Sequence, residues 1–333
     1  MLLMIELNVH LDGSLSHDDV LRLAKINGIP ESDILTSRFS MSQERLTIPD
    51  FLQYFTAPLR LLENRDSIIY ATYSLLKRLH EDGVSYAEVR FAPQQSTDDG
   101  LTQDQAVQAA IDGMNAARAE TGIQGNLILC CLRHRKGDQL NIDTVSTATR
   151  FLGHGVCAVD LAGDELNHPN SEFYELIALI KQCALPFTIH AGENRGPESV
   201  HDAIRLGARR IPHGIRALED DFVLNELIEK KVPLEISPCS EMVTCNSTIL
   251  DDLPLHDLYQ KGLLFSVGSH NMTIANTTTS QEYAALKHVY GFSEEEIADL
   301  ILKEIDMAFL DDAEKIVLKG RMKKNLKAFV RSL

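Results

Sequence analysis

Histidine recurs in four short motifs of this 333-residue chain, each at the end of an apolar run. The motifs are N-V-H-L-D-G, H-A-G-E, P-H-G and G-S-H-N, and they contain His10, His190, His213 and His270. One histidine at a strand end is more often structural than a ligand, but four on one rim favour a metal site. Imidazole nitrogens are the commonest zinc donors, and a catalytic zinc site combines three protein ligands with an open position for water. Glu193, three residues after His190, has the chemistry of a general acid or base beside such a water.

These motifs can meet only if the segments that carry them end at the same edge of one sheet. Eight β-rich runs alternate with helical segments along the chain, and most runs are almost continuously apolar. Such runs are typical of parallel strands that are covered on both faces. The runs are Ile5–His10, Tyr86–Phe91, Asn126–Arg133, Val156–Leu161, Phe187–His190, Arg209–His213, Leu234–Ser237 and Leu263–Gly268. This alternation predicts an α/β protein with a (β/α)8 TIM barrel, formed as a single domain by residues 1–333.

The competing topology is a doubly wound open sheet, which would require a glycine-rich phosphate turn after an early strand. The chain contains no G-x-G-x-x-G or P-loop motif, so the pattern favours the barrel. The segment from about Ser32 to Asp66 follows the first helical segment, and we expect it to form a helical insert above the barrel mouth. Function in such barrels collects at the carboxyl ends of the strands, so the four histidines and Glu193 are predicted to share one pocket there.

Composition narrows the classes of function. A content of 44% hydrophobic and 24% charged residues excludes an intrinsically disordered chain. The formal net charge of −16, without any basic block, argues against a nucleic-acid partner because phosphates would be repelled. The six cysteines form no C-x-x-C pair and lie mostly in apolar runs, which indicates reduced core thiols. Since no apolar stretch suits a signal peptide or a membrane span, we expect a cytoplasmic protein without a membrane partner, either monomer or dimer.

The motifs together resemble the adenosine deaminase family of metal-dependent barrel amidohydrolases. The resemblance runs from Ile5 to the C-terminal helices and includes H-L-D-G-S-L, Y-A-E-V-R-F-A-P, D-L-A-G-D-E, H-A-G-E and H-G-I-R in this order. It implies an enzyme that acts on a small purine nucleoside, adenosine or 2′-deoxyadenosine. A metal-activated hydroxide would attack the purine carbon 6 that bears the amine, and inosine and ammonia would be released. The implied cofactor is Zn2+, bound weakly or replaced by another divalent metal.

The resemblance also assigns roles to individual side chains. It makes His10 and His190 metal ligands, and it makes Glu193 the group that protonates the purine ring nitrogen N1. His213 would orient the attacking water and help to deprotonate it.

Three further positions are implied to contact the substrate. Asp12 would reach the ribose end of the nucleoside, and the backbone of Gly163 would contact the purine ring. Asn271, at the end of the eighth run, is assigned to the same substrate-binding set.

Two departures from the family pattern fall on the metal ligands. The family has H-x-H at the end of the first strand, where this chain has Asn8-Val9-His10. The family also has an acidic ligand within T-D-D or T-D-N at the end of the eighth strand. Here the aligned residues are Ser269–Asn271, so that His270 replaces the aspartate. A milder change places Pro212 before His213, where glycine is usual.

Three interpretations of these departures follow. In the first, a metal persists on His10, His190 and His270, and Asn8 fills space or binds weakly. In the second, the barrel is a metal-free or catalytically degenerate relative that binds a purine nucleoside. In the third, the scaffold performs a related hydrolysis with another metal. Loss of the carboxylate leaves the site one positive charge higher, which should weaken metal affinity.

Overall fold

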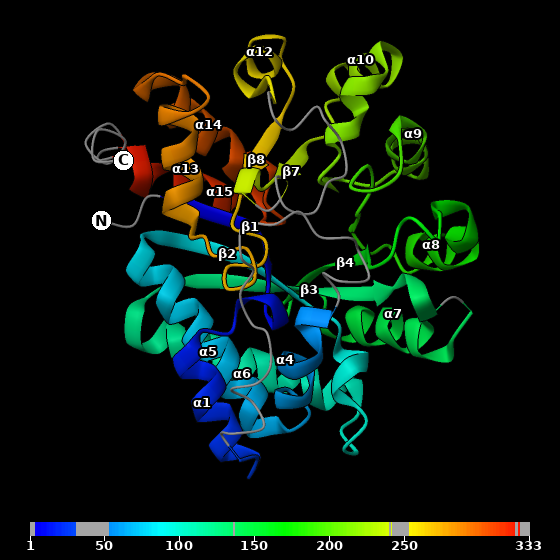
Figure 1. Cartoon of the computed structure of the whole chain (residues 1–333), viewed down its shortest axis with the longest axis vertical. Coiled ribbons are helices and arrows are strands. Elements are labelled where there is room, and N and C mark those ends of the chain that lie inside the picture. Colours follow the sequence, from blue (N-terminus) through cyan, green and yellow to red (C-terminus); the bar gives the residue numbers. More distant parts are fainter. Residues whose placement is uncertain are drawn as a thin grey trace.

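The computed structural model describes residues 4–30, 53–135, 137–239, 241, 253–323 and 326. Its centre is a ring of parallel strands surrounded by helices (Figure 1). The strands are β1 (Met4–His10), β2 (Val84–Phe91), β3 (Gln124–Leu132), β4 (Val156–Ala162), β5 (Phe187–Ile189), β6 (Ile211–Pro212), β7 (Leu234–Ile236) and β8 (Phe265–Val267). Strands β1 to β5 form one sheet, and strands β6 to β8 form a second sheet.

Isolated parallel bridges join these two sheets and close them into a barrel. Thr188 and Ala191 bridge the region of β5 to that of β6, and Val9 on β1 bridges to His270 after β8. The predicted (β/α)8 fold is therefore confirmed, although β6 is shorter than the predicted run. Pro212 has no backbone N–H to donate to a ladder, and His213 has a φ of 65°, so regular pairing stops there.

Helices follow most strands and cover the outside of the barrel (Figure 1). They are α1 (His17–Ile26), α4 (Thr56–Leu61), α5 (Arg65–Asp82), α6 (Gln103–Thr121), α7 (Gln139–Phe151), α8 (Tyr174–Gln182), α9 (Pro197–Leu206), α10 (Asp221–Lys230), α12 (Leu255–Gln260), α13 (Thr279–His288), α14 (Glu294–Met307) and α15 (Asp312–Lys323). Capping boxes begin α1, α6, α13 and α14, where a serine or threonine side chain accepts from the third helical N–H. These local signals explain why helices begin where the periodic apolar pattern does.

The predicted insert between the first helix and α5 lies only partly within the described residues. Residues 31–52 are outside them, whereas Gln53–Phe55 form a short 3-10 helix that leads into α4. Phe55 and Leu59 line a cavity at the barrel mouth. The described part of the insert therefore lies where it was expected.

The barrel interior contains charged side chains, which the largely apolar runs did not lead us to expect there. Arg90 on β2 pairs with Glu235 on β7 at 2.5 Å, and Arg210 pairs with both Glu88 and Glu235 at 2.5 Å. All four side chains are at most 1% exposed. Because each charge has an opposite partner, the network avoids an uncompensated buried charge, which would be strongly destabilising.

The described cysteines are free thiols. Cys130, Cys131 and Cys157 are buried, as predicted for core thiols, and Cys245 lies outside the described residues. Burial raises the pKa of Cys131 and holds this thiol in its neutral form.

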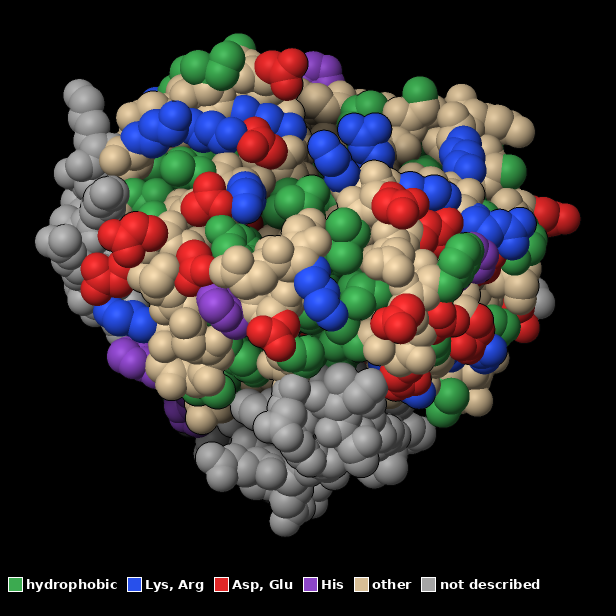
Figure 2. All heavy atoms as spheres, turned by 90° about the horizontal axis from the view of Figure 1, so that it is seen from above, with side chains coloured by type: hydrophobic (Ala, Val, Ile, Leu, Met, Phe, Trp, Pro, Cys, Tyr) green, Lys and Arg blue, Asp and Glu red, His purple; other side chains and the backbone are tan. Residues whose placement is uncertain are grey.

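Charged side chains of both signs occur on the surface. Figure 2 shows acidic and basic side chains side by side on one face, with apolar groups between them. The net charge of −16 therefore coexists with basic side chains that lie among the acidic ones on this face. Among the described residues, no helix combines the length and the apolar character that a membrane crossing would require.

Candidate active site

A cavity of about 260 Å³ lies at the carboxyl ends of the strands. Seven of the eight predicted site residues line it: His10, Asp12, Gly163, His190, Glu193, His270 and Asn271. The eighth, His213, lies beside them, with its ring centroid 4.9 Å from that of His270 and 5.4 Å from that of His190. The fold thus brings all eight residues to one end of the barrel.

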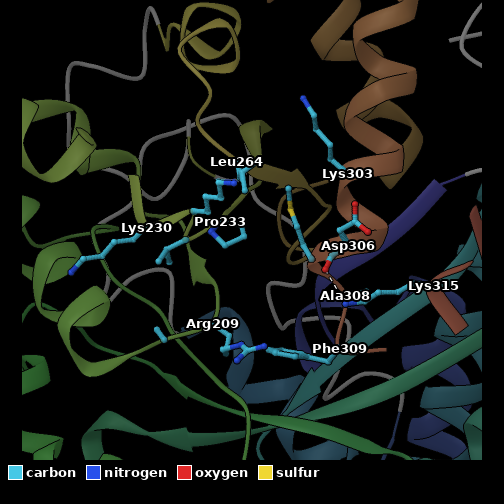
Figure 3. Close-up of a pocket in the computed structure, with 13 residues that line it drawn as sticks. Arg209, Lys230, Pro233, Leu264, Lys303, Asp306, Ala308, Phe309 and Lys315 are labelled. Carbon is cyan, nitrogen blue, oxygen red and sulfur yellow. Dashed lines mark hydrogen bonds between the residues drawn. The ribbon is translucent and has the colours of Figure 1, made fainter. Parts of the chain in front are cut away.

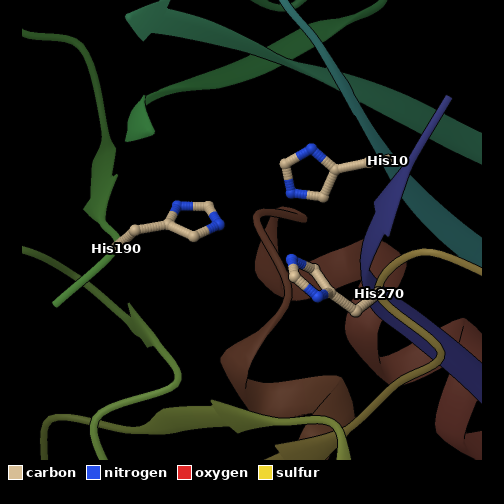
Figure 4. Close-up of side chains that lie close together, drawn as sticks. All are labelled: His10, His190 and His270. Carbon is tan, nitrogen blue, oxygen red and sulfur yellow. The ribbon is translucent and has the colours of Figure 1, made fainter. Parts of the chain in front are cut away.

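Three of these histidines offer ring nitrogens to a common point. Those of His10, His190 and His270 all lie within 4.8 Å of one another, and Figure 4 shows the three rings around a shared space. Among the described residues, Nε2 of His10 is buried and has no hydrogen-bond partner. Burial lowers the pKa of both His10 and His270 well below the usual value, and neighbouring histidine charge lowers it further. A metal ion requires neutral rings, so the lowered pKa of His10 and His270 and the unpartnered Nε2 of His10 fit such an ion.

His190 is oriented from behind by a carboxylate. Its Nδ1 lies 2.8 Å from Oδ2 of Asp160, and Oγ1 of Thr188 donates to Oδ1 of Asp160 at 2.5 Å. Burial raises the pKa of Asp160, but the charges of His190 and Arg90 outweigh it and hold that pKa well below its usual range. A carboxylate at this distance favours a proton on Nδ1, which would leave Nε2 of His190 for a metal.

Asn8 is engaged by an interior arginine. Its Oδ1, the only side-chain atom with metal affinity, accepts a hydrogen bond from Nη1 of Arg90 at 2.8 Å. Arg90 can only donate, so this contact determines which end of the Asn8 amide faces it. The structure therefore shows Asn8 as a hydrogen-bond partner of the interior arginine.

Two of the five described non-glycine residues with a positive φ are site histidines. His213 and His270 have φ values of 65° and 55°, in the left-handed region that non-glycine residues rarely adopt. The N–H of His270 donates to the carbonyl of Asn8 at 2.8 Å, and that of His213 donates to the carbonyl of Glu235 at 2.9 Å. These bonds hold both residues in a conformation that costs about 1–2 kcal/mol each. Such strain is typical of functional sites.

Glu193 and His213 face each other beside the cluster. Oε2 of Glu193 lies 3.7 Å from Nε2 of His213. The loop that carries Glu193 is held by Glu165, whose carboxylate accepts the N–H groups of Gly192 at 2.7 Å and of Glu193 at 3.1 Å. Glu165 belongs to the D-L-A-G-D-E motif, but no local pattern revealed that it supports a loop 27 residues further along the chain.

A residue that sequence reasoning missed lies on the other side of His213. Oε1 of Glu241 is 2.9 Å from Nδ1 of His213, and Glu241 is fully buried. Burial lowers the pKa of His213, but the charges of Glu193 and Glu241 outweigh it and raise that pKa to about 10. The S-P-C-S-E segment after the seventh run was a signal at a strand end, but nothing local placed its glutamate on His213.

The substrate side of the cavity combines an apolar wall with carboxylates. Phe55, Leu59 and Leu132 are apolar lining residues that the sequence did not single out. Burial raises the pKa of Asp12 to about 6, although hydrogen bonds from its own N–H and that of Gly13 lower it. No lysine or arginine lines this cavity among the described residues.

The fold and the site define the class of barrel amidohydrolases, and comparison with known proteins gives the family. Residues 4–325 match the profile described as adenosine deaminase. An adenosine deaminase from Haemophilus ducreyi is 39% identical over 322 residues, which cover 94% of each chain. The solved adenine deaminase from Arthrobacter aurescens has a TM-score of 0.85 at 26% identity and covers 98% of this chain and 100% of its own. An amidohydrolase from Burkhoderia ambifaria, solved with bound Zn, has a TM-score of 0.87 at 19% identity, with coverage of 99% and 92%.

This chain belongs to the adenosine deaminase family. Family membership confirms the resemblance that was drawn from the five motifs and the expected class of hydrolase. The family is metal-dependent, which agrees with the cluster of His10, His190 and His270.

Proposed function

We propose that this chain is an adenosine aminohydrolase that removes the 6-amino group of adenosine or 2′-deoxyadenosine, with zinc on His10, His190 and His270. The observation that carries the proposal is the pair of Glu193 and His213, 3.7 Å apart, beside the three histidines. The chemistry that a divalent metal supplies at such a cluster is Lewis acidity, which makes water nucleophilic near neutral pH.

The two residues of the pair divide the proton transfers. Glu193 lines the cavity and would donate a proton to the purine ring nitrogen N1, which makes carbon 6 more electrophilic. His213 presents Nε2 toward Glu193 and, in its neutral form, would orient the water and accept its proton. Both groups are supported from behind, Glu193 by the contact of Glu165 with its backbone and His213 by Glu241.

Metal binding by His270 has a consequence for Asn271. Nδ2 of Asn271 lies 3.0 Å from Nδ1 of His270, while its Oδ1 is buried without a hydrogen-bond partner in the described part of the chain. With Nε2 of His270 on a metal, Nδ1 would carry the proton and would need an acceptor. A half-turn of the Asn271 amide would supply Oδ1 to that proton and turn Nδ2 toward the substrate space.

The lining supports a neutral nucleoside as the substrate. The apolar wall of Phe55, Leu59 and Leu132 suits a flat purine, and the backbone of Gly163 is open to its edge. Asp12 would accept a hydrogen bond from a ribose hydroxyl. Since the described lining has carboxylates and no lysine or arginine, it offers a substrate phosphate no permanently charged cation.

We also infer that the whole chain acts as one domain in a reducing compartment. The barrel uses strands from β1 to β8, so both ends of the described chain contribute to one core. The free cysteines support a cytoplasmic location.

Metal analysis combined with an ammonia-release assay tests the proposal. Protein purified without added zinc should contain a stoichiometric divalent ion, dominated by zinc, and should release ammonia from adenosine but far less from AMP. A protein without metal that binds adenosine and releases no ammonia, even after zinc is added, would support the degenerate nucleoside-binding alternative instead. Activity that is restored by another divalent ion but not by zinc would overturn only the identity of the metal.

A further inference from the structure

We propose that Glu241 is a positioning residue that fixes the tautomer and orientation of His213 for the deamination. The contact joins Oε1 of Glu241 to Nδ1 of His213 at 2.9 Å, a normal hydrogen-bond distance. Glu241 is fully buried, and His213 is 0% exposed. The inference rests on the proposed function for its catalytic consequence, but the tautomer itself can be measured without turnover.

The backbone around Glu241 explains why its carboxylate reaches the ring. The N–H of Glu241 donates to the carbonyl of Ser237 at 2.8 Å, which forms a helical turn immediately after β7. On the other side, the N–H of His213 donates to the carbonyl of Glu235 on β7 at 2.9 Å. Both residues are thus tied to the same strand, and the left-handed φ of 65° at His213 directs its ring relative to that strand.

A carboxylate on Nδ1 decides which ring nitrogen carries the proton. Glu241 accepts from Nδ1–H, so that whenever His213 is in its neutral form the lone pair of the ring is on Nε2. Nε2 is the nitrogen that faces Glu193, and it has no hydrogen-bond partner among the described residues. Without Glu241 the proton could reside on either nitrogen, and only a fraction of the molecules would present an acceptor to the reacting water.

The position of this carboxylate also compensates for the change at β8. The segment after β8 presents His270 and Asn271, so no carboxylate enters the site from there. Glu241 comes from the segment after the neighbouring strand β7 and contacts His213, whose ring packs against His270 with centroids 4.9 Å apart. A buried negative charge therefore lies next to the histidine cluster, on a residue that is not one of the three proposed metal ligands.

The molecule contains a matched pair of the same chemistry outside the site. Nδ1 of His201 on α9 lies 2.6 Å from Oε2 of Glu226 on α10. Neither residue lines the mouth cavity, and the His201 side chain is 33% exposed. Substitution of Glu226 therefore controls for the general loss of a histidine–glutamate contact.

The test compares Glu241→Gln and Glu241→Ala with Glu226→Gln. Each variant is assayed for kcat and KM with adenosine, for metal content, and for thermal unfolding. Loss of a carboxylate behind a functional histidine typically lowers activity about 10- to 100-fold, so we expect this loss in kcat for Glu241→Ala with KM and metal content unchanged. Glu241→Gln keeps the shape and an acceptor oxygen, so a smaller loss is expected, and Glu226→Gln should behave as the native protein.

The second readout is the 15N NMR spectrum of histidine-labelled protein, with the His213 signals assigned from His213→Gln. At a pH where the His213 ring is neutral, its Nδ1 signal in the native protein should be that of a protonated nitrogen and its Nε2 signal that of an unprotonated one, and in Glu241→Ala both should move toward a mixture of tautomers. An unchanged kcat together with an unchanged His213 spectrum in Glu241→Ala would overturn the proposal. If Glu241→Ala does not fold, Glu241→Gln decides by the same two measurements.

Failure of the proposed function can be told apart from failure of this inference. A native protein without deaminase activity, but with a His213 tautomer that depends on Glu241, would refute the deamination and retain the positioning role. An active native enzyme whose two Glu241 variants match its kcat and its His213 spectrum would support the deamination and refute the positioning role.

Discussion

The barrel has a cavity at each end, and the larger one is not the candidate site. The cavity at the amino ends of β6 to β8 has a volume of about 440 Å³, compared with about 260 Å³ at the mouth. It is lined by basic side chains, among them Arg209, Lys230, Lys231, Lys303 and Lys315, several of which are labelled in Figure 3. The two cavities differ in volume, and they also differ in whether the polar side-chain atoms near them have hydrogen-bond or ion-pair partners.

At the amino end, two of the lining lysines form ion pairs with nearby carboxylates. Lys230 pairs with Glu226 at 2.7 Å, and Lys303 pairs with Asp299 at 2.7 Å. Lys230 is the last residue of α10, where a positive charge is favoured by the helix dipole. Local electrostatics thus account for these cations without a ligand.

At the mouth, buried nitrogens lack partners. Nε2 of His10 and Nε2 of His213 are buried without hydrogen bonds among the described residues. A buried polar atom without a partner costs about 1–3 kcal/mol, so such atoms persist where a ligand or substrate satisfies them. Of these two cavities, only the smaller one at the mouth has buried histidine nitrogens without hydrogen bonds in or beside its lining, among the described residues.

The largest expected effect is the loss of metal from His270→Ala. Only two imidazoles, His10 and His190, would remain, so we expect the metal to be released and the deaminase activity to be abolished. Elemental analysis after dialysis and an ammonia assay measure both outcomes. The matched change at the other cavity, Lys315→Ala, should leave metal content and kcat unchanged. Stoichiometric metal in His270→Ala would show that His270 is not a ligand.

Glu193→Gln should have the next largest effect. The substitution removes the proton donor but little of its shape, so kcat should fall about 10²- to 10⁴-fold while a purine nucleoside still binds. Steady-state kinetics and calorimetric binding of inosine measure the two quantities. Native activity in this variant would eliminate Glu193 as the acid.

A smaller effect is expected when the ligand pattern of the family is restored. The double substitution Asn8→His and His270→Asp returns a carboxylate that balances the ion, so metal should survive competition with a chelator better than in the native protein. Asn8→His alone should destabilise the fold by about 1–3 kcal/mol, because Arg90 loses the acceptor at 2.8 Å. The effects on metal retention are expected to be coupled. Native protein that already keeps stoichiometric zinc against a strong chelator would contradict the expected weak binding.

The smallest effect is expected at the amino end. Lys231 caps α10 with a φ of 53°, where glycine avoids the strain of a side chain, so Lys231→Gly should stabilise the protein by about 0.5–1 kcal/mol. Urea unfolding measures the change, and kcat should not move. The neighbouring Lys230→Gly, at a helical position, should instead destabilise by about 1 kcal/mol. A loss of activity in Lys231→Gly would show that the two ends of the barrel are not independent.

Much of the fold and of the histidine cluster was predictable because the signals are local. Apolar runs alternate with helical segments whatever their partners are, and parallel strands necessarily end at one edge, so His10, His190 and His270 could be placed together from their positions at strand ends. The charged interior was not predictable, because an apolar run does not say that Arg90 meets Glu235, 145 residues away.

The supports of the site were decided only by the tertiary structure. Asn8 read as a weakened ligand, yet its oxygen is engaged by Arg90 from a strand 82 residues further on. Glu241 lies 28 residues after His213, and their contact depends on the turn after β7 and on the left-handed backbone at His213. Residue types and their order reveal which groups can do chemistry. Which group holds another in place depends on distances between side chains, and these exist only once the barrel has closed.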